Sequence, residues 1–296
     1  MDQKAISFSD KLETHSFLTK IVRLFTVPLL NSIPSSLLQG AMKKTSRDAE
    51  TVVHKGGSTH ALEAMYTRYH RGFFSRGIKQ GISDIFWHHL VSQPKAIRNR
   101  LRIVKELLRL KASSLVEGRE DQNEKIPVSI LSIAGGSSRS LIHMIADMHG
   151  EGIKYPIEVI TIDKDKSALD IGEKVARENS VSECFRWVVG KANEVDTLVP
   201  GKQFDVIEIV GLLDYFPKER AVRLIQNVKK VLRAGGCVIA ANVTPNSEMV
   251  FVRKTGWPEM QYRSPKEFEE IFHESGFTQV SLRVEPLGVH MIITAQ

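Results

Sequence analysis

The segment ILSIAGGSSRS, residues 130–140, places Gly135 and Gly136 between an apolar run and a helical pattern. A turn at the start of a helix carries free backbone N–H groups and positive potential, which favour an anionic ligand. A second apolar run ends at Asp163, whose carboxylate can accept hydrogen bonds from both hydroxyls of a ribose. The glycines lack the G-x-G-x-x-G spacing of a dinucleotide fingerprint, and alone they are more typical of a tight turn. The order strand, turn, helix, strand and Asp nevertheless indicates a site for a nucleoside-bearing ligand.

Residues 128–296 must supply the elements that position these groups. Apolar strand patterns alternate there with amphipathic helical patterns, which predicts a parallel sheet with helices on both faces. The carboxyl ends of the strands would then hold the ligand. The expected strands are 128–134, 157–163, 185–192, 204–211 and 237–243, and the expected helices are 140–149, 166–179, 218–232 and 264–277.

The chain ends with two strand patterns, 278–285 and 288–295, that have no helix between them. Strands joined by so short a link must be antiparallel, because a parallel pair needs a long crossover connection. We therefore expect an α/β fold with a Rossmann-like seven-stranded sheet that finishes in an antiparallel C-terminal hairpin. A nicotinamide-binding domain does not normally end in this way.

Residues 1–118 contain helical patterns and no convincing strand, and we expect them to form a helical cap beside the ligand edge of the sheet. The polar residues 119–127 lack periodicity and predict a linker into the domain 128–296. The apolar stretch 17–38 contains two basic residues and two prolines, so it predicts neither a membrane span nor one long helix. No segment has a signal-peptide layout and the two cysteines are far apart, so we expect a cytoplasmic protein.

The charge of the chain is unevenly distributed over its 296 residues. Residues 1–125 carry 21 Lys and Arg against 12 Asp and Glu, whereas the remainder carries 20 against 22. The basic part could be the solvated side of a lid, could lie against an anionic membrane surface, or could bind nucleic-acid phosphate. We favour these interpretations in that order, because no RNA-binding module is recognisable.

Four ordered segments, ILSIAGG, ITIDKDKSAL, GLLDYFP and LRAGGCVIAANV, resemble the class I S-adenosylmethionine-dependent methyltransferase superfamily, whose sheet ends in the same hairpin. With GWPEMQYRSPKEF they are similar to a narrower group that includes enzymes forming 3-hydroxypalmitic acid methyl ester. Within SIAGGSS only Gly136 strictly matches the superfamily's D/E-x-G-x-G-x-G motif, because Ser132, Ala134 and Ser138 replace the acid and two glycines. Since Ala and Ser do not easily adopt positive φ, we expect a narrower turn and altered cofactor binding.

The resemblance implies S-adenosylmethionine as the cofactor, bound at the carboxyl ends of the strands. After the third strand the superfamily often has an acid that contacts the adenine amino group, whereas this chain reads GKAN. Asn193 could accept that hydrogen bond through its side-chain carbonyl, or it could lie in solvent. The implied cofactor-binding residues are Ala134, Gly135, Gly136, Asp163, Lys164, Lys191, Ala192, Asn193 and Gly211.

Methyl transfer from a sulfonium is an in-line displacement, so the protein must mainly align the reacting atoms and exclude water. A base is needed only where the acceptor carries a proton. A carboxylate acceptor is already ionised, whereas a hydroxyl makes Asp214 and His290 candidate catalytic bases. Asp214 is equally typical of a cap before the helix 218–232, and His290, within a strand pattern, is more typical of a packed histidine.

Aromatic residues in two regions are candidates for contact with the acceptor. Tyr66 and Tyr69 share one face of a predicted helix over 59–74, which we place innermost in the cap, although plain packing of the two rings is the more common outcome. Arg263 could pair with an acceptor carboxylate, although a solvated arginine is more common on a loop. The candidates after the fourth and fifth strands are Tyr215, Trp257, Tyr262 and Arg263.

We therefore expect an S-adenosylmethionine-dependent methyltransferase that acts on a small, partly apolar metabolite, by O-methylation of a carboxylate or a hydroxyl. One alternative is an RNA methyltransferase that uses the basic N-terminal region. Another is a degenerate binding module that kept the fold without catalysis. We expect a small-molecule acceptor, no metal and no nucleic acid, and the sequence indicates no particular oligomeric state.

Overall fold

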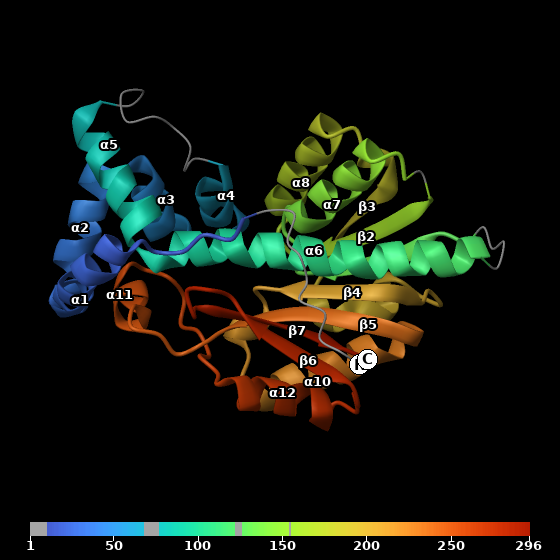
Figure 1. Ribbon diagram of the computed structural model, residues 1–296. Coiled ribbons are helices and arrows are strands. Elements are labelled where there is room, and N and C mark those ends of the chain that lie inside the picture. Colours follow the sequence, from blue (N-terminus) through green and yellow to red (C-terminus); the bar gives the residue numbers. More distant parts are fainter. Residues whose placement is uncertain (1–10, 68–76, 122–125, 154) are drawn as a thin grey trace.

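The computed structural model describes residues 11–67, 77–121, 126–153 and 155–296. Its seven strands form one sheet with the order β3-β2-β1-β4-β5-β7-β6, which confirms the expected α/β class (Figure 1). The strands β1 to β5 pair in parallel, as the alternation of patterns predicted. The strands are β1 (Val128–Ile133), β2 (Ile157–Asp163), β3 (Phe185–Val189), β4 (Phe204–Val210), β5 (Leu232–Val243), β6 (Val280–Val284) and β7 (His290–Ala295).

The C-terminal hairpin is antiparallel, as its short connection predicted. β7 lies between β5 and β6 and pairs antiparallel with both. Glu285 holds the turn of the hairpin, because its carboxylate accepts hydrogen bonds from the backbone N–H groups of Leu287 at 2.9 Å and Val289 at 2.8 Å. The register pairs His290 with Val243 at the end of β5. The hairpin therefore carries His290 to the carboxyl edge of the parallel strands.

Helices cover both faces of the sheet. On one face Leu131 of β1 packs in a cluster with Leu224 of α10 and Phe268 of α12. On the other face Ile130 packs in a cluster with Ile103 of α6 and with residues of α7. The alternation of buried residues along β1 thus feeds two separate cores. From Ser92 onward the described α-helices are α6 (Ser92–Asp121), α7 (Arg139–Gly150), α8 (Lys166–Glu178), α9 (Val195–Leu198), α10 (Lys218–Lys230), α11 (Met249–Lys254) and α12 (Pro265–Glu274).

The long helix α6 runs across the whole molecule (Figure 1). Ile103 is buried in the core of the sheet, whereas Ile97, six residues earlier, belongs to the core of the N-terminal helices. We expected a linker over 119–127, but the helix continues through Asp121. Its last turn is fixed to the sheet because Arg119 donates hydrogen bonds to Asp205 and to the carbonyl of Pro127, each at 2.7 Å.

The N-terminal helices pack around a third cluster that contains Leu38, Val52, Trp87 and Phe251 of α11. Within the described residues no strand precedes β1, which agrees with the expected helical cap. The cap helices are α1 (Phe17–Ser32), α2 (Ser35–Thr45), α3 (Arg47–Lys55), α4 (Thr59–Thr67), α5 (Ile78–Ile85) and the short π-helix η2 (Phe86–Leu90).

The apolar stretch 17–38 forms α1 and the start of α2, which meet at an angle of 115°. The stretch is therefore not one long helix, as expected, and the break falls at Pro34, whereas Pro28 lies inside α1. Pro28 is exposed, so water can bond the carbonyl that loses its partner. Among the described helices, none alone is long and apolar enough to cross a membrane, and α1 and α2 reach that length and composition only as a bent pair.

Candidate active site

The turn after β1 has a left-handed backbone at three positions. The φ angles are +51° at Ala134, +55° at Gly136 and +47° at Ser138. Our expectation that Ala and Ser would avoid positive φ was therefore wrong. The left-handed backbone at Ala134 and at Ser138 costs about 1 kcal/mol of folding free energy at each position. Hydrogen bonds hold the turn, because the backbone N–H of Ser138 donates to the carbonyl of Gly135 and its hydroxyl lies 2.8 Å from that of Thr161. The turn thus keeps its shape without the two missing glycines.

Gly135 packs against the side chains below the turn, where a Cβ would lie 2.3 Å from Ser132 Oγ. Gly135→Ala should therefore lower the free energy of unfolding by about 1–3 kcal/mol, the usual cost of overpacking. Gly118→Ala on α6 is the matched control, since nothing lies within 4 Å of its Cβ, and it should leave stability unchanged or slightly raised. Urea unfolding measures both changes. Equal stability of the two variants would contradict the tight packing of the turn.

Asp163, at the end of β2, faces the turn after β1. Its Oδ2 accepts a hydrogen bond from the backbone N–H of Gly136 and its Oδ1 accepts one from the N–H of Asp165, both at 2.9 Å. Because β1 and β2 are parallel neighbours, their carboxyl ends meet at the same edge. The carboxylate is therefore fixed by backbone donors, while its remaining lone pairs can accept hydrogen bonds from a ribose.

A cavity of about 990 Å³ opens at this edge of the sheet. Its size reaches the upper part of the range of ligand cavities, about 300–1,000 Å³. Tyr66 of α4 and Thr59 form part of its wall on the side of the cap. All the residues predicted to hold the cofactor line it, namely Ala134, Gly135, Gly136, Asp163, Lys164, Lys191, Ala192, Asn193 and Gly211. The cavity therefore fits a nucleoside-bearing cofactor.

Glu208 of β4 supplies a carboxylate that the turn motif lacks at Ser132. These two residues are in register on neighbouring strands, and Ser132 Oγ donates to Glu208 Oε2 at 2.7 Å. Ser140 Oγ donates to the other oxygen at 2.5 Å. Burial raises the pKa of Glu208, which lines the large cavity. The sequence analysis missed this residue, although an acid inside the apolar run FDVIEIVG is a signal because buried acids are rare.

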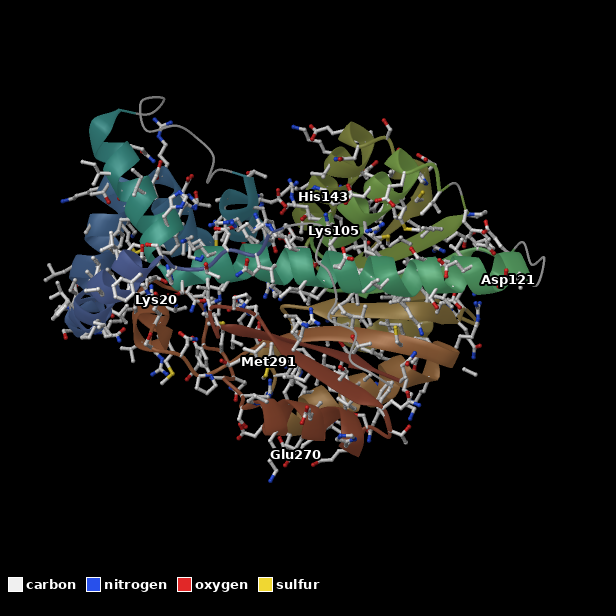
Figure 2. All side chains as sticks on the ribbon, in the orientation of Figure 1. Lys20, Lys105, Asp121, His143, Glu270 and Met291 are labelled. Carbon is white, nitrogen blue, oxygen red and sulfur yellow. The ribbon has the colours of Figure 1, made fainter. Side chains whose placement is uncertain are left out.

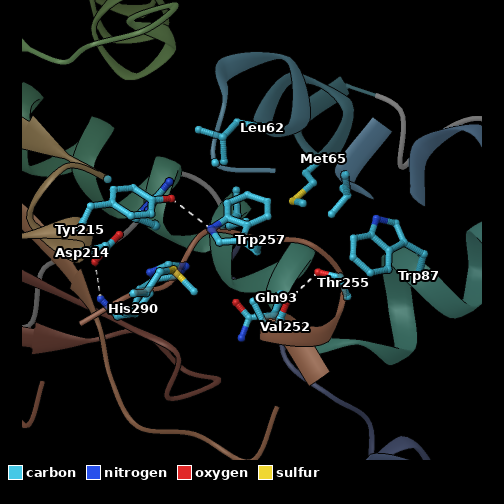
Figure 3. Close-up of a pocket in the computed structure, with 17 residues that line it drawn as sticks. Leu62, Met65, Trp87, Gln93, Asp214, Tyr215, Val252, Thr255, Trp257 and His290 are labelled. Atoms are coloured by element: carbon cyan, nitrogen blue, oxygen red, sulfur yellow. Dashed lines mark hydrogen bonds between the residues drawn. The ribbon is translucent and has the colours of Figure 1, made fainter. Parts of the chain in front are cut away.

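A second cavity, of about 50 Å³, lies between the cap and the sheet. Its walls are largely apolar, with Met65, Trp87 and Trp257 among them, while Asp214 and His290 lie at one end with Tyr215 (Figure 3). The two cavities adjoin, because they share the residues Gly57, Leu62, Arg100, Gly211 and Tyr215. A ligand in the small cavity would thus meet a cofactor in the large one.

His290, at the start of β7, has only 3% of its surface exposed. Neither of its ring nitrogens has a hydrogen-bond partner among the described residues. Burial, reinforced by the positive charge of Arg100, holds the pKa of His290 well below 6.5, so the ring is neutral at neutral pH. A neutral imidazole with a free nitrogen can accept a proton from a ligand. His290 is thus a buried histidine, as its strand pattern indicated, but it also faces the small cavity.

The depressed pKa of His290 makes the stability of the fold sensitive to acid. The unfolded chain takes up this proton near pH 6.5 and the folded protein does not, so stability is complete above that pH and falls below it. The loss approaches about 1.4 kcal/mol per pH unit. In urea unfolding between about pH 7 and about pH 5, wild type should therefore lose more stability than His290→Phe. Equal losses would mean that His290 has an ordinary pKa.

Asp214 lies in the short 3-10 helix η5 (Leu213–Tyr215) and is buried. It does not cap the next helix, because α10 begins after Pro217 without a side-chain cap. Instead its Oδ1 accepts a hydrogen bond from the backbone N–H of Val243 at 2.8 Å, and burial raises its pKa. Within the described part of the chain no three His, Cys, Asp or Glu side chains form a group that could hold a metal.

Tyr215 and Trp257 are the predicted acceptor residues that line the small cavity. The indole N–H of Trp257 donates to the hydroxyl of Tyr215 at 3.1 Å (Figure 3). Tyr66 lines the large cavity instead, and burial raises its pKa. Helix α4, which carries Tyr66, is described as far as Thr67, and Tyr69 lies outside the described residues.

Arg263 and Tyr262 line neither of these cavities. Arg263 is not solvated but buried, and its guanidinium donates to Asn242 Oδ1 at 2.5 Å, to the carbonyl of Leu213 at 2.9 Å and to that of Phe216. Arg263 therefore ties the loop after β4 to the end of β5, which leaves its guanidinium engaged with the protein. Tyr262 is half-buried, and burial raises its pKa to about 12.

Arg100 of α6 is the functional candidate that the sequence analysis missed most clearly. It is only 4% exposed, lines both cavities, and its Nε has no hydrogen-bond partner among the described residues. Its guanidinium lies beside Gly211, where a Cβ would be in ordinary van der Waals contact with Arg100 Nη1 at 3.6 Å. The signal in the sequence is its position between Ile97 and Val104 on the apolar stripe of the helix, where a charge is unusual.

Residues 57–296 match the sequence profile of a family described as "Putative methyltransferase". The match covers the whole sheet and the cap residues from Gly57 onward that line the two cavities. The chain belongs to this methyltransferase family. With its seven-stranded sheet and antiparallel hairpin it is a class I S-adenosylmethionine-dependent methyltransferase, as the resemblance implied.

Solved structures share the fold of this methyltransferase. One, described as a possible exported protein from Bordetella parapertussis, is 15% identical, with 89% of this chain and 96% of that chain covered and a TM-score of 0.60. A "putative O-methyltransferase" from Nostoc punctiforme is 18% identical, with 84% and 71% covered and a TM-score of 0.54. An O-methyltransferase family protein from Burkholderia thailandensis is 13% identical, with 94% and 70% covered and a TM-score of 0.52. No curated protein matches the methyltransferase in sequence.

Proposed function

We propose that this methyltransferase methylates a hydroxyl oxygen of a small, partly apolar acceptor. The proposal rests on His290, a buried neutral imidazole in the wall of the small apolar cavity, whose two nitrogens lack a partner among the described residues. A buried polar atom without a partner costs about 1–3 kcal/mol. An acceptor hydroxyl would supply the missing hydrogen bond and could lose its proton to the same nitrogen.

The large cavity would hold S-adenosylmethionine, which supplies the methyl group as an electrophilic sulfonium. Gly135 and Gly136 would let the cofactor approach the backbone of the turn, Asp163 would accept hydrogen bonds from the ribose, and the rim at Asn193 would face the base. Glu208 is positioned to accept hydrogen bonds from the ammonium group of the methionine part. The residues that both cavities share then mark the place where methyl carbon and acceptor oxygen meet.

The residues around the small cavity divide the work of the transfer. His290 takes the hydroxyl proton while the acceptor oxygen bonds to the methyl carbon and the carbon–sulfur bond breaks. The positive charge of Arg100 favours the ionised form of the acceptor oxygen. Trp87 and Trp257 keep water out, which strengthens these interactions.

A carboxylate acceptor fits this cavity less well than a hydroxyl. The buried carboxylate of Asp214 would oppose a second negative charge in so small a space. An ionised acceptor would also leave His290 without a role. Methyl-ester formation, which the similarity to the 3-hydroxypalmitic acid methyl ester group implies, stays a prediction. RNA methylation stays one too. The experiment must separate both from hydroxyl methylation.

A labelling experiment tests the proposal. The purified protein is incubated with methyl-labelled S-adenosylmethionine and, separately, with pools of phenols, aliphatic alcohols, fatty acids and bulk tRNA. We expect label in apolar hydroxyl compounds, as a methyl ether that resists alkali. Label that alkali releases as methanol would identify an ester, and label in RNA would identify a nucleic-acid acceptor. Either result would contradict hydroxyl methylation. Absence of transfer, together with absence of heat on calorimetric titration with the cofactor, would favour the degenerate binding module.

A further inference from the structure

The outer face of α1 is apolar and exposed along its whole length. Its inner face holds the helix in place, because Val27 is buried and Arg23 donates a hydrogen bond to Glu248 at 2.5 Å. Exposed apolar patches of this kind mark sites of interaction with proteins or membranes. The most exposed side chains, between 63% and 76% accessible, are Phe17, Leu18, Leu24, Phe25 and Leu29, and Ile21 and Val22 lie between them at 41% and 46%.

The charged residues within α1 and α2 are all positive. No acidic residue occurs between Glu13 and Asp48. Lys20 is exposed at the cap end of the molecule (Figure 2) and borders the apolar face of α1 one turn before Leu24. On α2, Lys44 is exposed and lies two turns after Leu37, which is 66% exposed, so the two share a face. An apolar helical face bordered by lysines is typical of helices that lie in the interface of an anionic bilayer.

The angle between α1 and α2 is fixed by contacts with the loop and helix after β5. Asn31 donates from its side-chain amide to the carbonyl of Ser247 at 2.9 Å, and Lys254 of α11 donates to the carbonyl of Ile33 at the bend, also at 2.9 Å. The apolar face of α1 is thus presented outward by a supported helix. This arrangement suits a helix lying in a membrane surface rather than a pair crossing the membrane.

We propose that α1 and the exposed side of α2, the docking face, insert into the surface of an anionic phospholipid bilayer. The apolar side chains would enter the boundary between headgroups and acyl chains, and Lys20 and Lys44 would meet the phosphates.

A second copy of this chain fits the docking face less well, because a two-fold contact would bring the same acid-free basic segment against itself. Leu30, on the inner face of α1, packs in one cluster with Trp87 and Val252 of the small cavity. The bilayer would therefore lie on the cap side of the small cavity.

Vesicle flotation of the full-length protein tests this proposal. Wild type should float with phosphatidylcholine vesicles that contain phosphatidylglycerol. Binding should be about tenfold weaker with phosphatidylcholine alone, which has no anionic headgroups, or at high salt, which screens the lysines from them. Leu24→Glu/Phe25→Glu should reduce binding at least about tenfold. The matched control is Leu110→Glu/Val284→Glu, at apolar positions on α6 and β6 that are 45% and 42% exposed, and it should float like wild type.

Two controls accompany the flotation. Thermal unfolding of both double variants should show that each is folded, and calorimetric titration with S-adenosylmethionine should show that the cofactor site is intact. Wild type that fails to float, or two double variants that float equally well, would overturn the proposal. A concentration-dependent dimer of wild type in sedimentation, lost in Leu24→Glu/Phe25→Glu and insensitive to vesicles, would assign the docking face to a second copy instead.

Discussion

Replacement of His290 by phenylalanine should lower kcat for a hydroxyl acceptor by about 10²–10⁴-fold, the range expected for the loss of a general base. Phenylalanine keeps a ring of similar shape in the buried position and removes both nitrogens. Because neither nitrogen has a partner among the described residues, the fold should remain as stable at neutral pH. His290 is not among the residues that line the large cavity, so the affinity for the cofactor should not change.

His149→Phe, near the end of α7, is the matched control and should keep full activity, since His149 lines neither cavity. A pH profile separates a base from a merely structural histidine. The depressed pKa of His290 keeps the wild-type ring neutral down to well below pH 6.5, so kcat should not fall between about pH 8 and about pH 6. An active His290→Phe variant, or an acid limb centred near pH 6.5, would remove His290 from the mechanism.

Asp163→Ala should raise the Kd for S-adenosylmethionine by about 10–150-fold, which corresponds to the loss of about 1.5–3 kcal/mol of hydrogen bonding to a charged group. Two effects combine, because the carboxylate is placed to bond the ribose and also holds the backbone of Gly136 and Asp165. Isothermal titration calorimetry measures the change directly. Asp163→Asn should lose less, since the amide keeps one carbonyl oxygen as an acceptor.

Asp170→Ala on α8 is the control for Asp163→Ala, because Asp170 is exposed, pairs with Lys166 and lines neither cavity. It should bind the cofactor like wild type. Asp170→Ala should unfold at nearly the wild-type urea concentration, whereas Asp163→Ala should unfold at a lower one, because two backbone N–H groups lose their acceptor. Unchanged affinity in Asp163→Ala would place the ribose elsewhere in the large cavity and would contradict the proposed orientation of the cofactor.

The parts of the site that follow from local pattern could be predicted from the sequence. The order of apolar runs and helical patterns predicted the sheet, and the turn at Gly135 and Gly136 and the acid at Asp163 fall at the ends of adjacent strands as expected. The hairpin was predictable because a short link permits only antiparallel pairing. Each of these inferences uses neighbours in the sequence and a rule of backbone geometry.

The rest depends on contacts between distant segments, which no local pattern encodes. Glu208 reaches Ser132 only because β4 pairs with β1 in that register, and Arg100 enters the site only because α6 crosses the edge of the sheet. Arg263 is typical of a solvated loop in sequence, yet three acceptors from other segments bury it. The backbone of Ala134 shows the same limit, since it adopts a positive φ that its residue type disfavours.

Helix α6 has a mechanical consequence for how ligands enter. It is one rod of 30 residues, ~45 Å long, with Ile97 in the core of the cap and Ile103 in the core of the sheet. A rod embedded in both halves cannot serve as a hinge between them, so the cap does not swing open as a unit about residues 119–127. The movement that admits an acceptor must be local, in α4, in η2 or in the segment that carries Trp257. Spin labels on α6 and α10 should therefore keep their separation when ligands bind, whereas labels on α4 and α10 should change theirs.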